Sequence, residues 1–272
     1  MKLELKKFDI TQIKDDKVVV MIGKRHTGKS VLIADLLSNH TELPIGTVIS
    51  GTESANQFFG NMVPKILIHD EYKASIIENV VARQKLIMKR KNQPGGDSID
   101  PRAFLILDDC LYDSTWTKHK DVRTIFMNGR HLKMFFILSM QYPLGIPPNL
   151  RTNIDFIFIL RENIVANRKR LYDNYAGMFP TFEIFCQVMD QCTENYECIV
   201  IDNTTSSNKL EECVFWYKAS IHGPFKVCKQ HYWDLSKNIS ASDEDEDKYD
   251  PDAFKSKRGP NIRVHKNRQK FN

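Results

Sequence analysis

One stretch of the sequence combines glycines, a lysine and a hydroxyl at a spacing that suits phosphate binding. It fits the pattern G-x-x-x-x-G-K-[ST] and consists of Gly23, Lys24, Arg25, His26, Thr27, Gly28, Lys29 and Ser30. Its glycines allow a tight turn whose backbone N–H groups converge on phosphate oxygens, and a following helix adds its partial positive charge. The lysine then reaches the β- and γ-phosphates, and the serine hydroxyl binds Mg²⁺. The stretch predicts a phosphate-binding loop for ATP or GTP.

The segments on either side of the loop distinguish this interpretation from a plain glycine turn with a surface lysine. The apolar run Val18–Ile22 precedes the loop, and a segment of helical character, Val31–Leu37, follows it. A buried strand, a glycine-bounded loop and a helix start are the context that phosphate binding requires. The flanks therefore favour the nucleotide site.

Two acids follow a second apolar segment. Ala103–Leu107 has the composition of a buried strand, and Asp108 and Asp109 come directly after it. In nucleotide hydrolases with a phosphate loop, the first such acid binds Mg²⁺ and the second polarises the attacking water. Turns also favour aspartate, so the pair is informative because the loop lies upstream. We expect Ser30 and Asp108 at the metal and Asp109 in catalysis.

Gln141 lies at the tip of the next predicted strand, Met134–Ser139. If that strand neighbours the one that carries the acids, a polar side chain at its end can face the γ-phosphate and its water. Gln141 is therefore the candidate sensor of the γ-phosphate. The alternative is a glutamine that bonds the proline-rich loop after it.

Apolar strands alternate with helical segments along most of the chain. Such alternation indicates an α/β fold with a mostly parallel sheet, helices on both faces and a ligand at the carboxyl ends of the strands. Two further strands are predicted to form a closing β-pair after a helical stretch in two pieces, and a short piece is a third strand or an edge. The segments are, for strands, 18–22, 46–50, 66–68, 103–107, 134–139, 154–160, 197–201 and 213–217, and, for helices, 31–37, 72–91, 118–127 and 167–188.

Composition predicts a soluble globular protein with one sizeable core, or with one core and an appendage. The chain has 272 residues, of which 42% are hydrophobic and 27% charged. No apolar run has the length of about 20 residues that spans a bilayer, so no transmembrane segment is predicted. The first seven residues alternate charge with leucine and do not form a signal peptide. We expect a protein of the cytosol or nucleus.

The C-terminal part of the sequence loses its apolar residues and changes its charge. Seven acids lie between Asp243 and Asp252, and seven Lys or Arg residues and no acids follow from Lys255. We predict an ATPase domain over residues 1–235 and a disordered acidic-then-basic tail over 236–272. The formal charge of +5 is compatible with DNA binding but does not establish it.

The six cysteines show no C-x-x-C pair. Without secretion, buried free thiols are the expected state. Cys186, Cys192 and Cys198 are six residues apart, which is not a zinc spacing, although a metal site at a loop between them remains open.

The order and wording of the motifs resemble the DNA-packaging ATPases of large eukaryotic DNA viruses. These poxvirus- and iridovirus-type proteins belong to the FtsK–HerA superfamily of P-loop ATPases. The first motif is common to many ATPases, and the last three, in this order, carry the resemblance. It covers roughly residues 15 to 205 and rests on Gly23–Ser30, Leu105–Cys110, Asn128–His131, Ser139–Tyr142 and Leu150–Asp155.

This resemblance implies a RecA-like core that hydrolyses ATP with Mg²⁺ and drives double-stranded viral DNA into the capsid. It also implies a homo-oligomeric ring of about five or six subunits, with capsid or membrane-associated virion proteins as further partners. The location would be the host cytoplasm in a viral factory, the virion or the nucleus. Matching family positions are Lys29, Ser30, Asp108, Asp109 and Gln141.

Two points of the resemblance bear on catalysis. The second acid in this superfamily is commonly glutamate, whereas Asp109 is shorter and must hold water at a different reach. The family's arginine finger matches Arg130 or Arg151, and we prefer Arg151, on a loop before a strand that would face a neighbouring subunit. The alternative for each is a surface arginine without a role.

Other functions remain open from sequence. A cellular or plasmid DNA translocase or helicase of the same superfamily would share these motifs. A nucleotide-controlled assembly scaffold would bind ATP without needing hydrolysis. Stimulation of ATP turnover by duplex DNA distinguishes a motor from a scaffold.

Overall fold

The computed structural model describes residues 4–110, 114–143 and 145–246. Within them, one eight-stranded sheet runs through the molecule in the order β3-β2-β4-β5-β1-β6-β7-β8. The six strands from β3 to β6 are parallel, and β7 and β8 continue the sheet antiparallel. The strands are β1 Val18–Ile22, β2 Gly46–Ser50, β3 Ile68–His69, β4 Ala103–Asp108, β5 Met134–Met140, β6 Phe156–Ile159, β7 Glu197–Asp202 and β8 Val214–Lys218.

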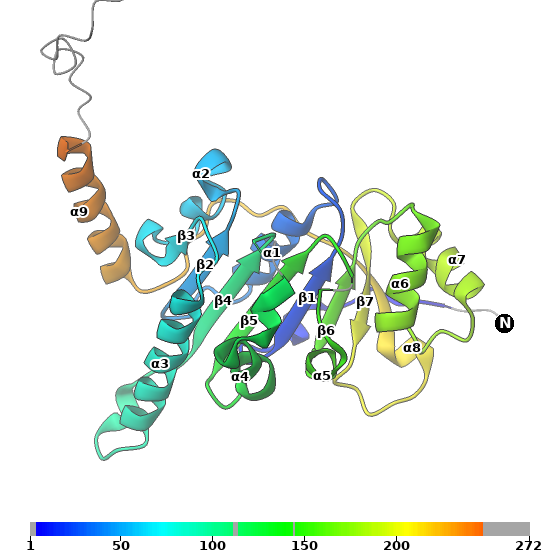
Figure 1. The fold of residues 1–272 in the computed structure, drawn as a ribbon, viewed down its shortest axis with the longest axis horizontal. Coiled ribbons are helices and arrows are strands. Elements are labelled where there is room, and N and C mark those ends of the chain that lie inside the picture. The colour runs from blue at the N-terminus through cyan, green and yellow to red at the C-terminus, as the bar shows by residue number, and fades with distance from the viewer. Residues whose placement is uncertain (1–3, 111–113, 144, 247–272) are drawn as a thin grey trace, which may run out of the picture.

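Helices cover both faces of this sheet (Figure 1). The face toward the viewer carries α3 to α7, and the opposite face carries α1 together with the N-terminal segment and residues 59–63. The helices are α1 Lys29–Ser38, α2 Glu53–Asn56, α3 Ala74–Lys91, α4 Lys120–Asn128, α5 Pro148–Arg151, α6 Val165–Tyr175, α7 Phe182–Cys192, α8 Leu210–Cys213 and α9 Gln230–Glu246.

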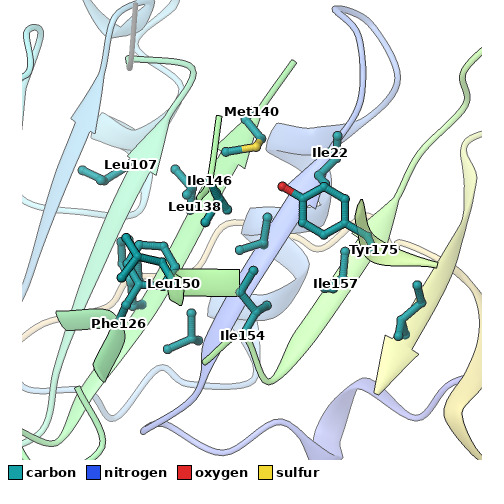
Figure 2. Packing of buried hydrophobic residues seen from close by; sticks show 14 of the residues in the cluster. Ile22, Leu107, Phe126, Leu138, Met140, Ile146, Leu150, Ile154, Ile157 and Tyr175 are labelled. Atoms are coloured by element: carbon teal, nitrogen blue, oxygen red, sulfur yellow. The ribbon is translucent and has the colours of Figure 1, made fainter. Parts of the chain in front are cut away.

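The central strands are hydrophobic on both faces because each face is covered. Every residue of β1, β4 and β5 is buried, as expected of parallel strands between two helical layers. Along β1, Val18, Val20 and Ile22 belong to the core under α3–α7, whereas Val19 and Met21 belong to the core under α1. Figure 2 shows part of the first core, where Leu150 and Ile154 lie in front of the strands.

The structure confirms the predicted RecA-like α/β sheet with helices on both faces. The strand β2 has the predicted bounds, and β7 and β8 form the predicted antiparallel closing pair. The short piece near residue 68 is the edge strand β3. The helical stretch predicted in two pieces consists of α6 and α7, which are separated by residues 176–181.

The predicted disorder from residue 236 is wrong for residues 236–246, because α9 continues to Glu246. Trp233 donates its indole N–H to the carbonyl of Val227 at 2.9 Å, and Ser236 is buried one turn further on. Trp233 and Ser236 are about one helical turn apart, so both can contact the rest of the protein from one side of a helix. Composition alone does not show this spacing. Residues 247–272, which hold three of the seven acids and the whole basic block, lie outside the described residues, and the proposed domain division stays a prediction.

Three expectations about composition can be set beside the structure. In the described part of the chain, no helix has the length and apolar character to cross a membrane. The six cysteines are free thiols. Among the same residues, no group of three or more His, Cys, Asp and Glu side chains could hold a metal ion.

Candidate active site

The loop between β1 and α1 is closed around the side chain of Lys29. Its ammonium donates to the carbonyl oxygens of Gly23 at 2.8 Å and Lys24 at 3.0 Å, and the side chain is 5% exposed. Gly28 caps the helix with a φ of 101°, a left-handed conformation that glycine adopts without a Cβ clash. At Gly23 a Cβ would lie 2.7 Å from the Cβ of Leu160. Glycine is therefore required at both positions, at Gly28 by the backbone conformation and at Gly23 by the close approach of Leu160.

Asp108 lies in a polar row across three neighbouring strands. The register places Ser50 of β2 and Ser139 of β5 on either side of it. Ser139 donates its hydroxyl to Oδ1 at 2.5 Å, and Ser50 donates to Oδ2 at 3.3 Å. Burial raises the pKa of Asp108, while the bond from Ser139 acts against that increase. The two serines therefore fix the orientation of the carboxylate, while its burial makes the charged form less stable than it would be in water.

Asp109 connects the loop lysine to Gln141. Its Oδ2 lies 3.1 Å from the ammonium of Lys29 and accepts a hydrogen bond of 3.1 Å from Nε2 of Gln141. The backbone N–H of Asp109 donates to the Ser139 hydroxyl at 3.2 Å, and its φ of 45° turns the side chain away from the path of β4. Its buried Oδ1 has no hydrogen-bond partner among the described residues.

The strand order explains why these three residues meet. β5 pairs with β4 on one side and with β1 on the other. The carboxyl ends of parallel strands share one edge of the sheet, so Gln141 lies between the acids and the loop. Gln141 therefore donates to Asp109, and among the described residues it has no hydrogen bond to the proline-rich loop, which was the alternative.

The oxygen groups at this edge fit a magnesium ion. A serine hydroxyl and a carboxylate are hard oxygen donors of the kind that Mg²⁺ binds, with waters and phosphates completing its shell. Ser30 is the second residue of α1 and is half-buried, and Asp108 presents its carboxylate from the end of β4. The unpartnered Oδ1 of Asp109 adds an acceptor next to them.

A second ion pair ties the loop to the end of β6. The ammonium of Lys24 lies 2.6 Å from the carboxylate of Glu162 and donates to Asn163 at 2.8 Å. Glu162 is 5% exposed and also accepts hydrogen bonds from the backbone of Ile164 and from Asn167. Burial alone would raise the pKa of Glu162, but Lys24 and these hydrogen bonds hold it below its usual value. The loop is thereby held by two ion pairs, one from Lys29 to Asp109 and one from Lys24 to Glu162.

The two candidate arginines lie at the opposite edge of the sheet. Arg151 ends the short helix α5 ahead of β6, and Arg130 follows α4 ahead of β5. Arg151 therefore does not lie on the loop that sequence predicted. Its guanidinium hydrogen-bonds Asn174 of α6 and lies over the ring of Tyr175, 5.5 Å from the ring centroid. Arg130 is exposed.

Sequence reasoning missed three groups at the carboxyl edge. Ser50 and Ser139 are polar residues at the ends of apolar strands, a signal that was present but could not be used without the strand order. Glu162 lies three residues after the end of β6, and its pairing with Lys24 depends on β1 and β6 being neighbours. The roles of the predicted site residues stay predictions.

The fold and this edge of the sheet define a RecA-like P-loop NTPase. No protein-family model matches the chain. Protein L437 of Acanthamoeba polyphaga mimivirus is 42% identical over 221 residues, which cover 80% of this chain and 78% of L437. Protein 088R of Invertebrate iridescent virus 3 is 41% identical over 202 residues, 74% of this chain and 75% of that protein. The chain therefore belongs to the family of these viral proteins.

Solved structures share the fold at low sequence identity. The DNA-packaging ATPase B204 of Sulfolobus turreted icosahedral virus aligns with a TM-score of 0.53 and 16% identity, over 75% of this chain and 98% of B204. The conjugation coupling protein TcpA of pCW3 aligns with a TM-score of 0.55 and 10% identity, over 85% and 66% of the chains. The viral relatives and this fold agree with the resemblance that the motifs predicted, and the DNA-packaging role stays a proposal.

Proposed function

We propose that the protein is an ATP-driven motor that moves double-stranded viral DNA into the capsid during virion assembly. The observation that carries the proposal is the meeting of Lys29, Asp109 and Gln141 at one edge of the sheet. A cation for the phosphates, a carboxylate and an amide that bonds it are the parts of a hydrolytic P-loop site. The viral relatives and the packaging ATPase with the same fold give this chemistry its context.

Nucleotide binding would rearrange the bonds of Lys29. Its ammonium now bonds two carbonyls of the loop and the carboxylate of Asp109. A triphosphate in the loop offers stronger charge-assisted bonds to the same group. Lys29 would then move from Asp109 to the phosphates, and Asp109 would become free to accept a proton from water.

Asp109 and Gln141 would then act on the attacking water. The carboxylate polarises the water as general base, and the amide of Gln141 fixes the orientation of Asp109. A bound Mg²⁺, held by Ser30 and Asp108, would neutralise charge on the β- and γ-phosphates. Ser139 would keep both acids in place through its two hydrogen bonds.

Completion of the site would require a neighbouring subunit. The candidate arginines lie at the amino ends of the strands, away from the loop of their own chain. In a ring, the amino edge of one subunit can face the carboxyl edge of the next. We infer that Arg151, or Arg130 in its place, acts on the γ-phosphate bound by the neighbour.

DNA would be held mainly through its phosphates, because a packaging motor must accept any sequence. Binding then weakens steeply with salt and hardly varies between duplexes of different sequence. Capsid or membrane-associated virion proteins would receive the motor, in the viral factory, the virion or the nucleus. Strong preference for one sequence at fixed salt would instead favour a site-specific regulator.

The decisive experiment measures ATP turnover of the full chain with and without long duplex DNA. A motor should hydrolyse ATP faster when DNA is added, with the increase lost in Lys29→Ala. A plasmid-type translocase is a second candidate, because the conjugation coupling protein TcpA has the same fold. DNA should stimulate ATP turnover in a viral packaging motor and in such a translocase alike. Turnover that ignores DNA, with nucleotide-dependent assembly, would establish the scaffold instead.

A further inference from the structure

A cavity of about 340 Å³ opens beside the phosphate loop, on the face of the sheet that carries α1. It begins at Gly28 and is lined by side chains from α1, the end of β6 and the two turns flanking β7 and β8. The side chains that define it are Val31, Leu160, Tyr196, Lys218 and Ile221. With Lys218 as the charged member, the lining is predominantly apolar among the residues that the structure describes.

Three of the apolar side chains at this cavity are unusually exposed. Tyr196 is 69% exposed, Ile221 91% and Val31 38%. Apolar surface of this kind gains about 25 cal/mol per Å² when a ligand covers it. The cavity thus offers a flat, hydrophobic ligand a favourable site within reach of the phosphate loop.

Tyr196 is held over the loop by a strained turn. Asn195 and Tyr196 have φ values of 51° and 66°, and a left-handed conformation is rare for a residue as bulky as tyrosine. Its ring lies against the loop, because a Cβ built on Gly28 would lie 3.6 Å from Cδ1 of Tyr196. Residues with strain of this kind cluster at active sites and ligand clamps, so the turn at Tyr196 is a candidate for ligand contact.

A buried aspartate of α1 holds the residues on either side of Ile221. Asp35 of α1 is 1% exposed and accepts hydrogen bonds from Tyr217 at 2.6 Å and from the backbone of Ser220 at 2.9 Å. Nε2 of His222 lies 2.6 Å from its other oxygen. Residues on both sides of Ile221 are therefore anchored to α1. In Figure 1 the segment after β8 passes behind the sheet on the side of α1 before it reaches α9.

We propose that this cavity binds the base of the nucleotide, by stacking on Tyr196 and contact with Val31 and Ile221. The inference rests on the proposed function, because it assigns the base to a nucleotide whose phosphates lie in Gly23–Ser30. Gly28 belongs to both the loop and the cavity, so the two sites are continuous.

The character of the cavity also determines which bases it accepts. Rejection of a wrong base requires buried polar groups that are left unpaired by it, and apolar walls discriminate weakly. The thiol of Cys198 is already bonded to the carbonyl of Tyr217 at 3.4 Å, which leaves the flexible Lys218 and the exposed hydroxyl of Tyr196 as the polar side-chain groups of the lining. Neither is buried, so neither imposes a penalty on a mismatched base. Larger purines stack better than pyrimidines. The site therefore accepts ATP and GTP alike, with CTP bound more weakly.

Calorimetric titration of the full chain with MgATP, MgGTP, MgCTP and inorganic tripolyphosphate tests this assignment. Wild-type affinities for ATP and GTP should agree within about 10-fold. Tyr196→Ala should weaken ATP and GTP by about 5- to 100-fold, the usual effect of losing an aromatic base stack. Its affinity for tripolyphosphate, which has no base, should not change. Ile221→Ser should give the same pattern with a smaller loss.

Two control variants belong to the same titration. Tyr196→Phe keeps the ring and should bind as the wild type does. Leu86→Ala removes an apolar side chain of α3 that is 48% exposed and lies outside the cavity, and it should leave all four affinities unchanged.

Different failures have different meanings. Equal loss of ATP and tripolyphosphate in Tyr196→Ala, unchanged ATP affinity in both cavity variants, or a preference for ATP over GTP above about 100-fold would each overturn the base site. The proposed motor would survive any of these results. If nucleotides bind as expected but DNA does not raise turnover, the motor fails while the base site stands.

Discussion

The carboxyl and amino edges of the same sheet differ in how their polar groups are used. At the carboxyl edge, groups at the ends of β2, β4 and β5 and at the start of α1 bond one another around Asp108 and Asp109. At the amino edge, Arg151 bonds residues of α6 in its own chain, and Arg130 faces solvent. β5 spans seven residues, so the two edges are about 20 Å apart.

This difference indicates which groups for the proposed ATP hydrolysis a single chain can supply. A single chain brings together the phosphate loop, both acids and Gln141. It does not bring an arginine to that edge from either family-matched position. The two edges become one site only if subunits assemble, so variants at each edge should fail in different ways.

The largest effect is expected at the amino edge. Arg151→Ala should lose about 10³-fold or more in turnover while ATP affinity is kept, because an arginine finger stabilises charge on the transferred phosphoryl group. Steady-state ATPase assays and nucleotide titration measure the two quantities. Mixed with Lys29→Ala, the variant should regain part of its activity at interfaces that pair an intact loop with an intact Arg151.

Asn174→Ala is the matched control for that experiment. It removes the intrachain partner of Arg151 but leaves the guanidinium in place, so turnover should persist. If Asn174→Ala is as inactive as Arg151→Ala, and mixing restores neither, then Arg151 supports the α5–α6 packing. The same mixing assay with Arg130→Ala then tests the other arginine.

The next effect is expected at Asp109. Asp109→Asn should retain ATP binding and lose about 10²- to 10⁴-fold in turnover, because an amide cannot take a proton from water. Because the neutral side chain also releases Lys29 from its ion pair, ATP affinity should be equal to or higher than that of the wild type. Single-turnover kinetics separate the two effects. Normal turnover would remove Asp109 from the mechanism.

Ser139→Ala should have an intermediate effect. The hydroxyl bonds Oδ1 of Asp108 and the backbone N–H of Asp109, so its loss should loosen both acids without removing either. Loss of such supporting groups usually costs 10- to 100-fold in metal affinity or activity, and about 10-fold is expected here. The Mg²⁺ concentration for half-maximal turnover should rise. Ser139→Thr, which keeps the hydroxyl, should recover most of the loss.

The smallest effect concerns the stability of the resting chain. Burial raises the pKa of Asp108 above its ordinary value of 3.8, so the folded state binds the proton more tightly than the unfolded state. The free energy of unfolding therefore falls as the pH rises from the ordinary pKa of Asp108 through its raised pKa in the folded state. At neutral pH the charged carboxylate destabilises the fold. Asp108→Asn should raise the melting temperature by a few degrees at neutral pH and show no gain in acid. Thermal unfolding without nucleotide or Mg²⁺ measures the difference. A lower melting temperature at neutral pH would show that the hydrogen bonds of the carboxylate outweigh its burial.

Much of the carboxyl edge could be predicted from sequence because its signals are local. The loop needs its glycines and lysine in a fixed order, and the acids follow an apolar strand directly. Each motif lies next to the strand that positions it, so spacing in sequence corresponds to position in space. The same holds for Gln141, since strand ends that share a sheet edge follow from a parallel fold.

The tertiary structure alone decided which strands are neighbours and what the intervening segments do. Strands buried on both faces are all similarly apolar, so their sequences do not specify their partners. The row Ser50–Asp108–Ser139, the pair Lys24–Glu162 and the cavity at Tyr196 each join residues far apart in the chain. Sequence by itself thus determined the loop, the acids and the alternation of elements. Long-range pairing and packing decided the strand order, the continuation of α9 and the walls beside the phosphate loop, because those depend on contacts that no local pattern encodes.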